Sequence, residues 1–177
     1  MENKNKRSSP ANLLAKECIV SALLKLIYIK PLSSITISEL CEKAGVSRMT
    51  FYRNFSSKEE IFTNQLSEIF AEYANDDLAL PENGIFYDKA HLIHFFTSLS
   101  KYKEFFDGLM FCGFGLYFLK MMNVYLIEKW SDQADSYRLI AFSGALYNTF
   151  FLWSSNGYRQ NPEELAEDLA EIFSNHE

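Results

Sequence analysis

The sequence predicts an all-α protein of about nine helices. Apolar residues recur along most of the chain at the 3.6-residue spacing of amphipathic helices, and few stretches show the two-residue alternation of strands. Gly and Pro, which are frequent in the turns of sandwiches and barrels, number only seven and four among 177 residues. Hydrophobic residues make up 48% of the chain and aromatic residues 16%, which is enough for a packed core.

Two helices are predicted at the start of the chain. Ser9 and Pro10 open the first, because serine is a preferred N-cap and proline is tolerated in the first helical turn, and Pro31 is expected to end it. Thr36 opens the second, with Glu39 completing a capping box. The positions expected to face the core are Ala15, Ile19, Ala22, Leu26 and Ile29 in the first helix, and Ile37, Leu40, Cys41 and Ala44 in the second.

A third helix is predicted to follow the second after a single break. Gly45 can take the left-handed conformation that closes a helix, and Ser47 can cap the next one. The new helix is expected to extend from about residue 48 to residue 55. Phe51 and Phe55 lie four residues apart and therefore on one side of it, so both are expected in the core.

The rest of the chain is predicted to form six further helices. The fourth begins with a capping box of Ser57 and Glu60 and extends toward Pro81, and the last begins at Asn161. Between them, helices are expected over about 88–100, 102–110, 114–130 and 135–155. The helix over 135–155 is apolar around most of its circumference, so it must be covered on nearly all sides. Residues expected inward on the fourth helix are Ile61, Phe62, Leu66, Ile69 and Tyr73.

The second and third helices form a helix-turn-helix, whose second helix can enter the major groove of DNA. An ordinary αα-hairpin within a bundle gives the same spacing. Arg48 and Arg53 favour DNA binding, because they can contact phosphate or guanine and no acid accompanies them. Residues 1–64 hold ten basic and six acidic residues, a net of +4, and the remainder holds seven basic and 17 acidic residues, a net of −10. The basic end is therefore expected to meet an anion and the acidic end to avoid DNA.

Four short sequences carry a family resemblance: SITISEL (34–40), AGVS (44–47), TFYRNF (50–55) and SKEEIF (57–62). Together they resemble the N-terminal domain of TetR/AcrR-family transcriptional regulators. The resemblance implies a DNA-binding domain over 1–56 and a helical effector-binding and dimerisation domain over 57–177. It also implies that Thr36 and Lys58 contact phosphates at helix N-termini. Carried over by position, the DNA-facing residues are Thr36, Ser47, Arg48, Met49, Thr50, Tyr52, Arg53, Asn54 and Lys58.

The segment from Ala141 to Ile172 resembles the final helix pair of the same family. This implies a homodimer, in which the pair packs against its two-fold mate and so matches a palindromic operator. The alternative is that the apolar surface of the helix over 135–155 is covered within one chain. The residues expected at the dimer interface are Gly144, Ala145, Phe151, Trp153, Leu165, Leu169 and Ile172.

Aromatic and methionine side chains are concentrated between residues 105 and 125. They suit a pocket for a small hydrophobic or aromatic effector and equally suit a solid core, and the family resemblance favours the pocket. The residues expected to line it are Phe105, Phe111, Phe114, Tyr117, Phe118, Met121, Met122 and Tyr125.

The expected function is that of a dimeric regulator, a repressor that binds a double-stranded DNA operator and is released by an effector. Two hypotheses from other classes stay open. One is an effector-independent DNA-binding or architectural protein that acts through a protein partner. The other is a small-molecule or haem carrier with a vestigial DNA domain.

The sequence shows no residue arrangement typical of catalysis, so we expect no enzyme, and we expect no cofactor and no metal. His91 and His94 lie three residues apart but have no evident third ligand. Cys18, Cys41 and Cys112 are expected to be buried free thiols. The start lacks the apolar core of a signal peptide, and the most apolar run, 108–119, is too short to span a bilayer, so we expect a cytoplasmic protein that does not enter the membrane.

Overall fold

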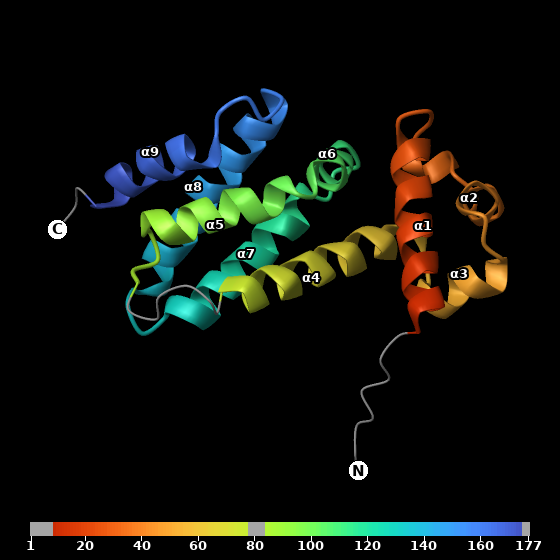
Figure 1. Cartoon of the computed structure of the whole chain (residues 1–177), viewed down its shortest axis with the longest axis horizontal. Coiled ribbons are helices and arrows are strands. Elements are labelled where there is room, and N and C mark those ends of the chain that lie inside the picture. The colour runs from red at the N-terminus through yellow and green to blue at the C-terminus, as the bar shows by residue number, and fades with distance from the viewer. Residues whose placement is uncertain (1–8, 78–83, 175–177) are drawn as a thin grey trace, which may run out of the picture. The chain divides into compact units, whose positions relative to one another are not determined.

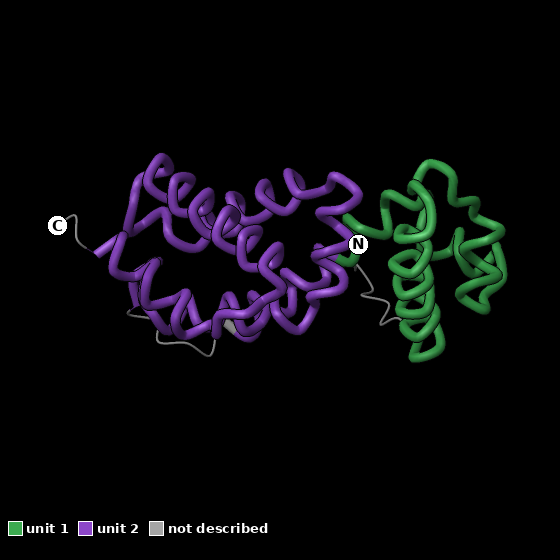
Figure 2. The backbone as a smooth tube through the Cα atoms, turned by 90° about the horizontal axis from the view of Figure 1, so that it is seen from above, with its two compact units in different colours: residues 1–65 green, residues 66–177 purple. Residues whose placement is uncertain are grey.

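The computed structural model describes residues 9–77 and 84–174. These residues form nine α-helices and one 3-10 turn and contain no strand, which confirms the all-α prediction. The chain divides into two compact units, residues 1–65 and 66–177 (Figure 2). The predicted break at Pro81 lies outside the described residues.

From residue 9 onward, where its description begins, unit 1 contains three helices, a 3-10 turn and the beginning of a fourth helix (Figure 1). Each of the first three helices begins with the side-chain cap that the sequence predicts: Ser9 accepts the N–H of Asn12, Thr36 that of Glu39, and Ser47 that of Thr50. The elements are α1 (Pro10–Ile27), η1 (Leu32–Ser34), α2 (Ile37–Ala44), α3 (Arg48–Asn54) and α4 (Lys58–Asp77), of which residues 58–65 belong to this unit.

The core of unit 1 is apolar, and each helix contributes buried side chains to it. Its most deeply buried side chains are Ile19, Leu23, Ile27, Ile35, Leu40, Phe51, Ile61 and Phe62. One predicted core position is wrong, because Ile29 is 73% exposed. The helix ends at Ile27, two residues earlier, since the residue before a proline, here Lys30, disfavours helical backbone. Ile37, Ala44 and Ala15 are only half-buried.

The turn between α2 and α3 has the predicted geometry. Gly45 lies in the left-handed region, with φ 68° and ψ 29°. Its N–H donates to the carbonyl of Glu42 at 3.2 Å, and the N–H of Val46 donates to the carbonyl of Cys41 at 3.0 Å. These bonds satisfy the last carbonyls of α2, as in other left-handed helix ends, and Ser47 then starts α3.

Unit 2 is a bundle in which α5 packs along α9 and α7 along α8 (Figure 1). Asp135 caps α8, and Asn161 caps α9 at the predicted start of the last helix. Asp88 precedes α5 as predicted, but its carboxylate accepts the N–H of Ile85 at 2.9 Å, and no helix N–H donates to it. The remaining helices are α5 (Lys89–Ser100), α6 (Lys103–Phe111), α7 (Gly115–Trp130), α8 (Ser136–Ser155) and α9 (Pro162–Ser174).

The three cysteines are free thiols, but only Cys41 is buried, whereas Cys18 and Cys112 are half-buried. Burial raises the pKa of the Cys41 and Cys112 thiols. A raised thiol pKa disfavours the reactive thiolate, which suits packing rather than chemistry at these positions.

No single helix among the described residues is long and apolar enough to cross a membrane. Over residues 9–77 and 84–174, α6 and α7 taken together are the one pair that meets the requirements of length and composition, and this pair is bent by 119° where the two helices join.

Candidate nucleic-acid interface

One side of α3 holds the helix on unit 1. Phe51 is fully buried and Phe55, which follows the last helical residue, is 3% exposed, with their ring centroids 5.9 Å apart. A helix of seven residues is too short to be stable alone, because nucleation costs more than so few hydrogen bonds return. Burial of these two rings and the Ser47 cap therefore keep α3 formed.

The other side of α3 faces solvent and is basic and polar. Arg48 and Arg53 are exposed, Met49 is 76% exposed, and Tyr52 is 54% exposed with its ring edge-on to Phe51 at 5.3 Å. No acidic residue occurs within the helix. Such a surface can place guanidinium groups against phosphate or guanine and an aromatic hydroxyl against phosphate.

Three other residues of the predicted DNA-facing set also form bonds that support α3 itself. The hydroxyls of Ser47 and Thr50 share a hydrogen bond of 2.9 Å, and Ser47 accepts the N–H of Thr50. Asn54 is half-buried and donates its side-chain N–H to the carbonyl of Thr50 at 2.9 Å. The amide oxygen of Asn54 takes no part in that bond and can still accept one from a base or a phosphate-bound water.

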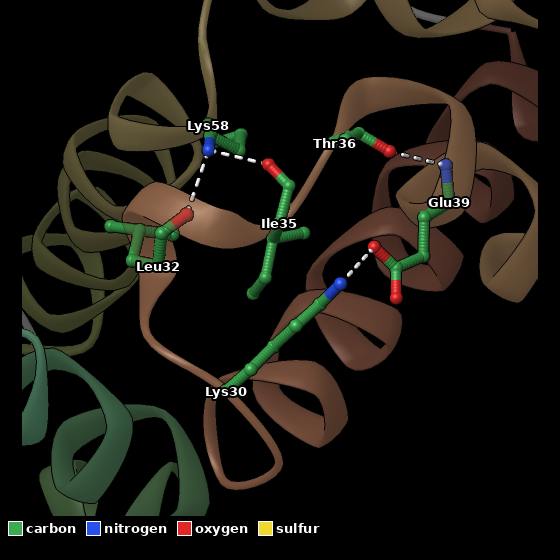
Figure 3. Close-up of polar contacts among 6 residues, drawn as sticks. All are labelled: Lys30, Leu32, Ile35, Thr36, Glu39 and Lys58. Atoms are coloured by element: carbon green, nitrogen blue, oxygen red, sulfur yellow. Dashed lines mark hydrogen bonds and ion pairs between the residues drawn. The ribbon is translucent and has the colours of Figure 1, made fainter.

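The two predicted phosphate contacts lie in different environments (Figure 3). Thr36 is exposed at the N-terminus of α2, where backbone N–H groups and the helix dipole attract anions. Lys58 is half-buried, and its ammonium group donates to the carbonyls of Leu32 at 2.7 Å and Ile35 at 2.5 Å. The structure thus turns the charge of Lys58 toward the protein's own backbone.

The predicted capping boxes differ in detail from the structure. The carboxylate of Glu39 accepts a hydrogen bond from Lys30 at 2.5 Å, which lowers the pKa of Glu39, and this pair links the end of α1 to the first turn of α2 (Figure 3). The carboxylate of Glu60 accepts from the hydroxyl and N–H of Ser56, one residue earlier than a capping box requires, and these bonds lower the pKa of Glu60.

The interior of unit 2, where the sequence predicts an effector pocket, is nearly solid. Phe106, Phe118 and Phe150 contact one another with ring centroids 5.0–5.5 Å apart. The enclosed cavity beside them has a volume of about 20 Å³, room for about one water. Of the predicted pocket residues, Met122 and Tyr125 line this cavity. Phe105 and Phe118 instead belong to the packed core, because mutual packing of the rings fills the space, and Phe111 is 64% exposed.

An open groove lies on the surface of unit 2 and has a volume of about 320 Å³. Three of the predicted pocket residues, Tyr117, Met121 and Tyr125, line it. Phe114 precedes α7 and lines neither the groove nor the enclosed cavity. The other residues of the groove are Phe70, Ala71, Lys120, Val124 and Glu128.

The two histidines of α5 have separate surroundings. His94 stacks on Tyr73 with centroids 4.8 Å apart, and its ring nitrogens lie 3.3 Å from the Ser98 hydroxyl and 3.4 Å from the Tyr73 carbonyl. His91 is buried edge-on to Trp130 at 5.0 Å. Within the described residues, no group of three or more His, Cys, Asp or Glu side chains is placed to hold a metal ion.

An apolar surface runs along one face of α8. Gly144 and Phe151 follow Tyr137 by seven and fourteen residues, so all three lie on the same side of the helix. Ile140 lies on this side too, between Tyr137 and Gly144. Tyr137 is 88% exposed and Phe151 48%, and nothing lies within 4 Å of the position that a Cβ on Gly144 would take. The sequence prediction omitted Tyr137 and Ile140, although the all-round apolar pattern of this helix was the signal that could have found them.

The other predicted interface residues differ in exposure. Ile172 of α9 is 57% exposed, and Ala145 and Leu165 are half-buried. Trp153 and Leu169 are buried within unit 2, and the Trp153 indole N–H donates to the carbonyl of Gln160 at 2.9 Å.

Residues 19–64, which include α2, α3 and most of α1, match the model of bacterial regulatory proteins of the tetR family. Residues 19–64 therefore form a TetR-family N-terminal segment. Its α2 and α3 are the helix-turn-helix of a TetR-family N-terminal domain, and TetR-family proteins are DNA-binding transcriptional regulators.

Similarity to a known protein extends beyond residues 19–64. The chain is 27% identical to the HTH-type dhaKLM operon transcriptional activator DhaS of Lactococcus lactis subsp. lactis (strain IL1403), over 56% of this chain and 63% of that protein. The match therefore spans less than two thirds of the length of that relative.

Solved structures share the fold over nearly the whole chain. Lin0861 from Listeria innocua gives a TM-score of 0.75 at 15% identity, covering 96% of this chain and 94% of its own. A tetR-family transcriptional regulator from Streptomyces coelicolor gives 0.54 at 18% identity, covering 91% and 79%. At these identities the likeness shows the fold, and it extends the TetR-like helical arrangement into unit 2.

Proposed function

We propose that this chain acts as a homodimer whose two α3 helices enter major grooves of a palindromic DNA operator. The observation that carries the proposal is the outer side of α3, where Arg48 and Arg53 are exposed without an acid while Phe51 holds the opposite side in the core. The net positive charge of residues 1–64 supports it, because phosphate neutralisation supplies much of the affinity for DNA.

The test is selection of genomic DNA fragments with the purified full chain, followed by anisotropy titration of the selected fragment at several salt concentrations. Wild-type protein is expected to bind with an affinity that falls steeply with salt, and Arg48→Ala is expected to bind more weakly. Arg159→Ala removes an exposed arginine from unit 2 and serves as the matched control. If no DNA fragment is enriched, the proposal is refuted.

The dimer is proposed to form through α8 and α9. The apolar face of α8, on which Tyr137, Ile140 and Phe151 are exposed, favours contact with a partner surface. Gly144 on the same face lets a second helix approach closely. Light scattering at micromolar concentration is expected to give twice the monomer mass. A monomer under those conditions would refute the dimer. It would also refute recognition of a palindrome, which requires two chains.

We propose repression as the direction of regulation, with release by a small hydrophobic or aromatic effector. The groove lined by Tyr117, Met121 and Tyr125 supports binding of an effector, since its volume of about 320 Å³ is within the range of small-molecule sites. Binding inside the enclosed cavity would require the aromatic side chains to move apart, so an effector there would stabilise a different conformation from the one described. A reporter gene behind the selected operator tests the direction. The relative DhaS is named an activator, and higher reporter output with the protein than without it would assign activation to this chain as well.

A second candidate function, regulation by a protein partner, is favoured by the nearly solid interior of unit 2. A regulator with an enclosed cavity of only about 20 Å³ can respond to a protein partner instead of a small molecule. A thermal-shift screen of small apolar and aromatic compounds separates the two. Stabilisation that disappears in Tyr117→Ala supports the effector, and absence of any shift supports the protein partner.

A further inference from the structure

The ammonium group of Lys58 reaches two backbone carbonyls, one of which, that of Ile35, has no partner within a helix. It donates to the carbonyls of Leu32 and Ile35, which are 26 and 23 residues away in sequence (Figure 3). Ile35 has extended backbone between η1 and α2 and is 2% exposed, so its carbonyl has neither a helical partner nor access to bulk water. A buried carbonyl requires a donor, and Lys58 supplies one.

This contact closes the base of the helix-turn-helix. Residues 36–57, between the two contacting residues, comprise all of α2 and α3 with their caps and turn. Lys58 is the first residue of α4, and Ile35 immediately precedes the Thr36 cap of α2. The Lys58–Ile35 hydrogen bond therefore fixes the two ends of the DNA-reading segment to each other, as a cross-link would.

A second polar contact holds the same segment less firmly. Lys30 and Glu39 form an ion pair at 2.5 Å, but their side chains are 32% and 36% exposed, and exposed pairs contribute little. Lys58 differs because its acceptors are backbone carbonyls, which cannot swing away as a carboxylate side chain can. Of these two polar contacts, the one made by Lys58 of α4 therefore restrains the segment more firmly.

We propose that Lys58 contributes to DNA binding mainly as a positioning residue of the DNA-reading segment, whose ammonium, with two of its three N–H donors on backbone carbonyls, holds α2 and α3 in the geometry that the operator requires. The inference rests on the proposed function, since it concerns how α3 meets DNA. It places this role ahead of the phosphate contact that the family resemblance implies at this position.

The experiment compares Lys58→Met, which keeps an unbranched stem without donors, and Lys58→Gln, which keeps two N–H donors without charge. Lys25→Met, at an exposed lysine of α1, is the matched control, and Arg53→Ala represents removal of a true phosphate or base contact. Each variant is titrated against the selected operator and against unrelated DNA over a series of salt concentrations. Hydrogen exchange of the amides of residues 36–57 is measured without DNA.

Lys58→Met is expected to bind the operator at least about tenfold more weakly, with unrelated DNA bound as before and the salt slope unchanged. Lys58→Gln is expected to retain part of the operator affinity, again with the wild-type slope, and remains informative if Lys58→Met does not fold. Exchange within residues 36–57 is expected to be faster in Lys58→Met than in Lys25→Met. Arg53→Ala is expected to reduce the slope by about 0.9 for each phosphate that the arginine neutralises, so by about 1.8 in a dimer.

Three results would overturn the inference: a slope reduced in Lys58→Gln as in Arg53→Ala, equal weakening of operator and unrelated binding, or unchanged exchange in residues 36–57. If the wild-type chain selects no DNA, the proposed function fails, but the exchange measurement still tests whether Lys58 holds the segment. If wild-type protein binds and Lys58→Met binds equally well, only the positioning role fails.

Discussion

Phe51 and Arg48 lie one turn apart on α3, and substitution of each is expected to affect a different property. Phe51 is fully buried and packs against Phe55 at 5.9 Å. Phe51→Ala removes this ring and leaves a cavity, which costs about 3–5 kcal/mol in other buried phenylalanines. A small domain has a total stability of only about 5–15 kcal/mol, so unit 1 should become much less stable. DNA binding is then abolished because α3 is no longer formed.

Arg48→Ala should have the opposite effect. The side chain is exposed in the first turn of α3, where a positive charge opposes the helix dipole, so its removal should change stability by less than about 0.5 kcal/mol. One base or phosphate contact is worth about 1–3 kcal/mol, so operator affinity should fall roughly 5- to 150-fold.

The assay must follow unit 1 separately from unit 2. Both tryptophans, Trp130 and Trp153, lie in unit 2, so their fluorescence in a urea titration reports that unit. Far-UV circular dichroism and hydrogen exchange over residues 10–65 report unit 1. The division of roles is refuted if Phe51→Ala unfolds at the wild-type urea concentration, or if fully folded Arg48→Ala binds the operator as tightly as wild type.

Three further predictions concern the turn, the dimer and alkaline stability. Gly45→Ala should lower the stability of unit 1 by about 1–2 kcal/mol, since φ is 68° and the added Cβ meets nothing within 4 Å, so backbone strain is the whole cost; an unchanged urea midpoint would contradict this. Phe151→Glu, at a side chain 48% exposed on the apolar face of α8, should give a monomer in light scattering with unchanged circular dichroism, and a persisting dimer would place the interface elsewhere. Burial, with the carboxylate of Glu72 accepting its hydroxyl, raises the pKa of Tyr102 to about 12. Because the unfolded value is about 10, the stability from protonated Tyr102 is present below pH 10 and disappears between about pH 10 and 12. Ultraviolet titration should show one tyrosine ionising near pH 12, and nearer to 10 in Glu72→Gln.

Helix starts could be predicted from the sequence because their signals are local. A serine, threonine or asparagine side chain needs only the N–H groups two or three residues ahead, and Ser9, Thr36, Ser47 and Asn161 all make such bonds. Asp88 shows the limit of such local signals. Its position before α5 was predictable, but its carboxylate bonds to Ile85, in the preceding loop, whose conformation the local pattern does not specify.

Contacts that join distant segments could not be predicted in the same way. The bonds of Lys58 depend on η1, a turn set by packing around Ile35, whereas the family resemblance, carried over by position, assigned Lys58 to phosphate. The aromatic residues of α6 and α7 pose a related problem, since helical periodicity marks a side chain as inward but does not say whether rings fill the space. Phe118 has three phenylalanine neighbours within 6.0 Å, and this mutual packing leaves little room.

The residues that fold the helix-turn-helix are largely separate from those that could read DNA. α3 is held by Phe51 and Phe55 and by the Ser47 cap, and, as we propose, positioned by Lys58, all directed toward the protein. Met49 and Arg53 on the outer side make little contact with the core, so changing them should cost little stability. A short helix anchored in this way can take different outer side chains without refolding. Exchange of Met49 should therefore alter which operator is bound before it alters whether the domain folds.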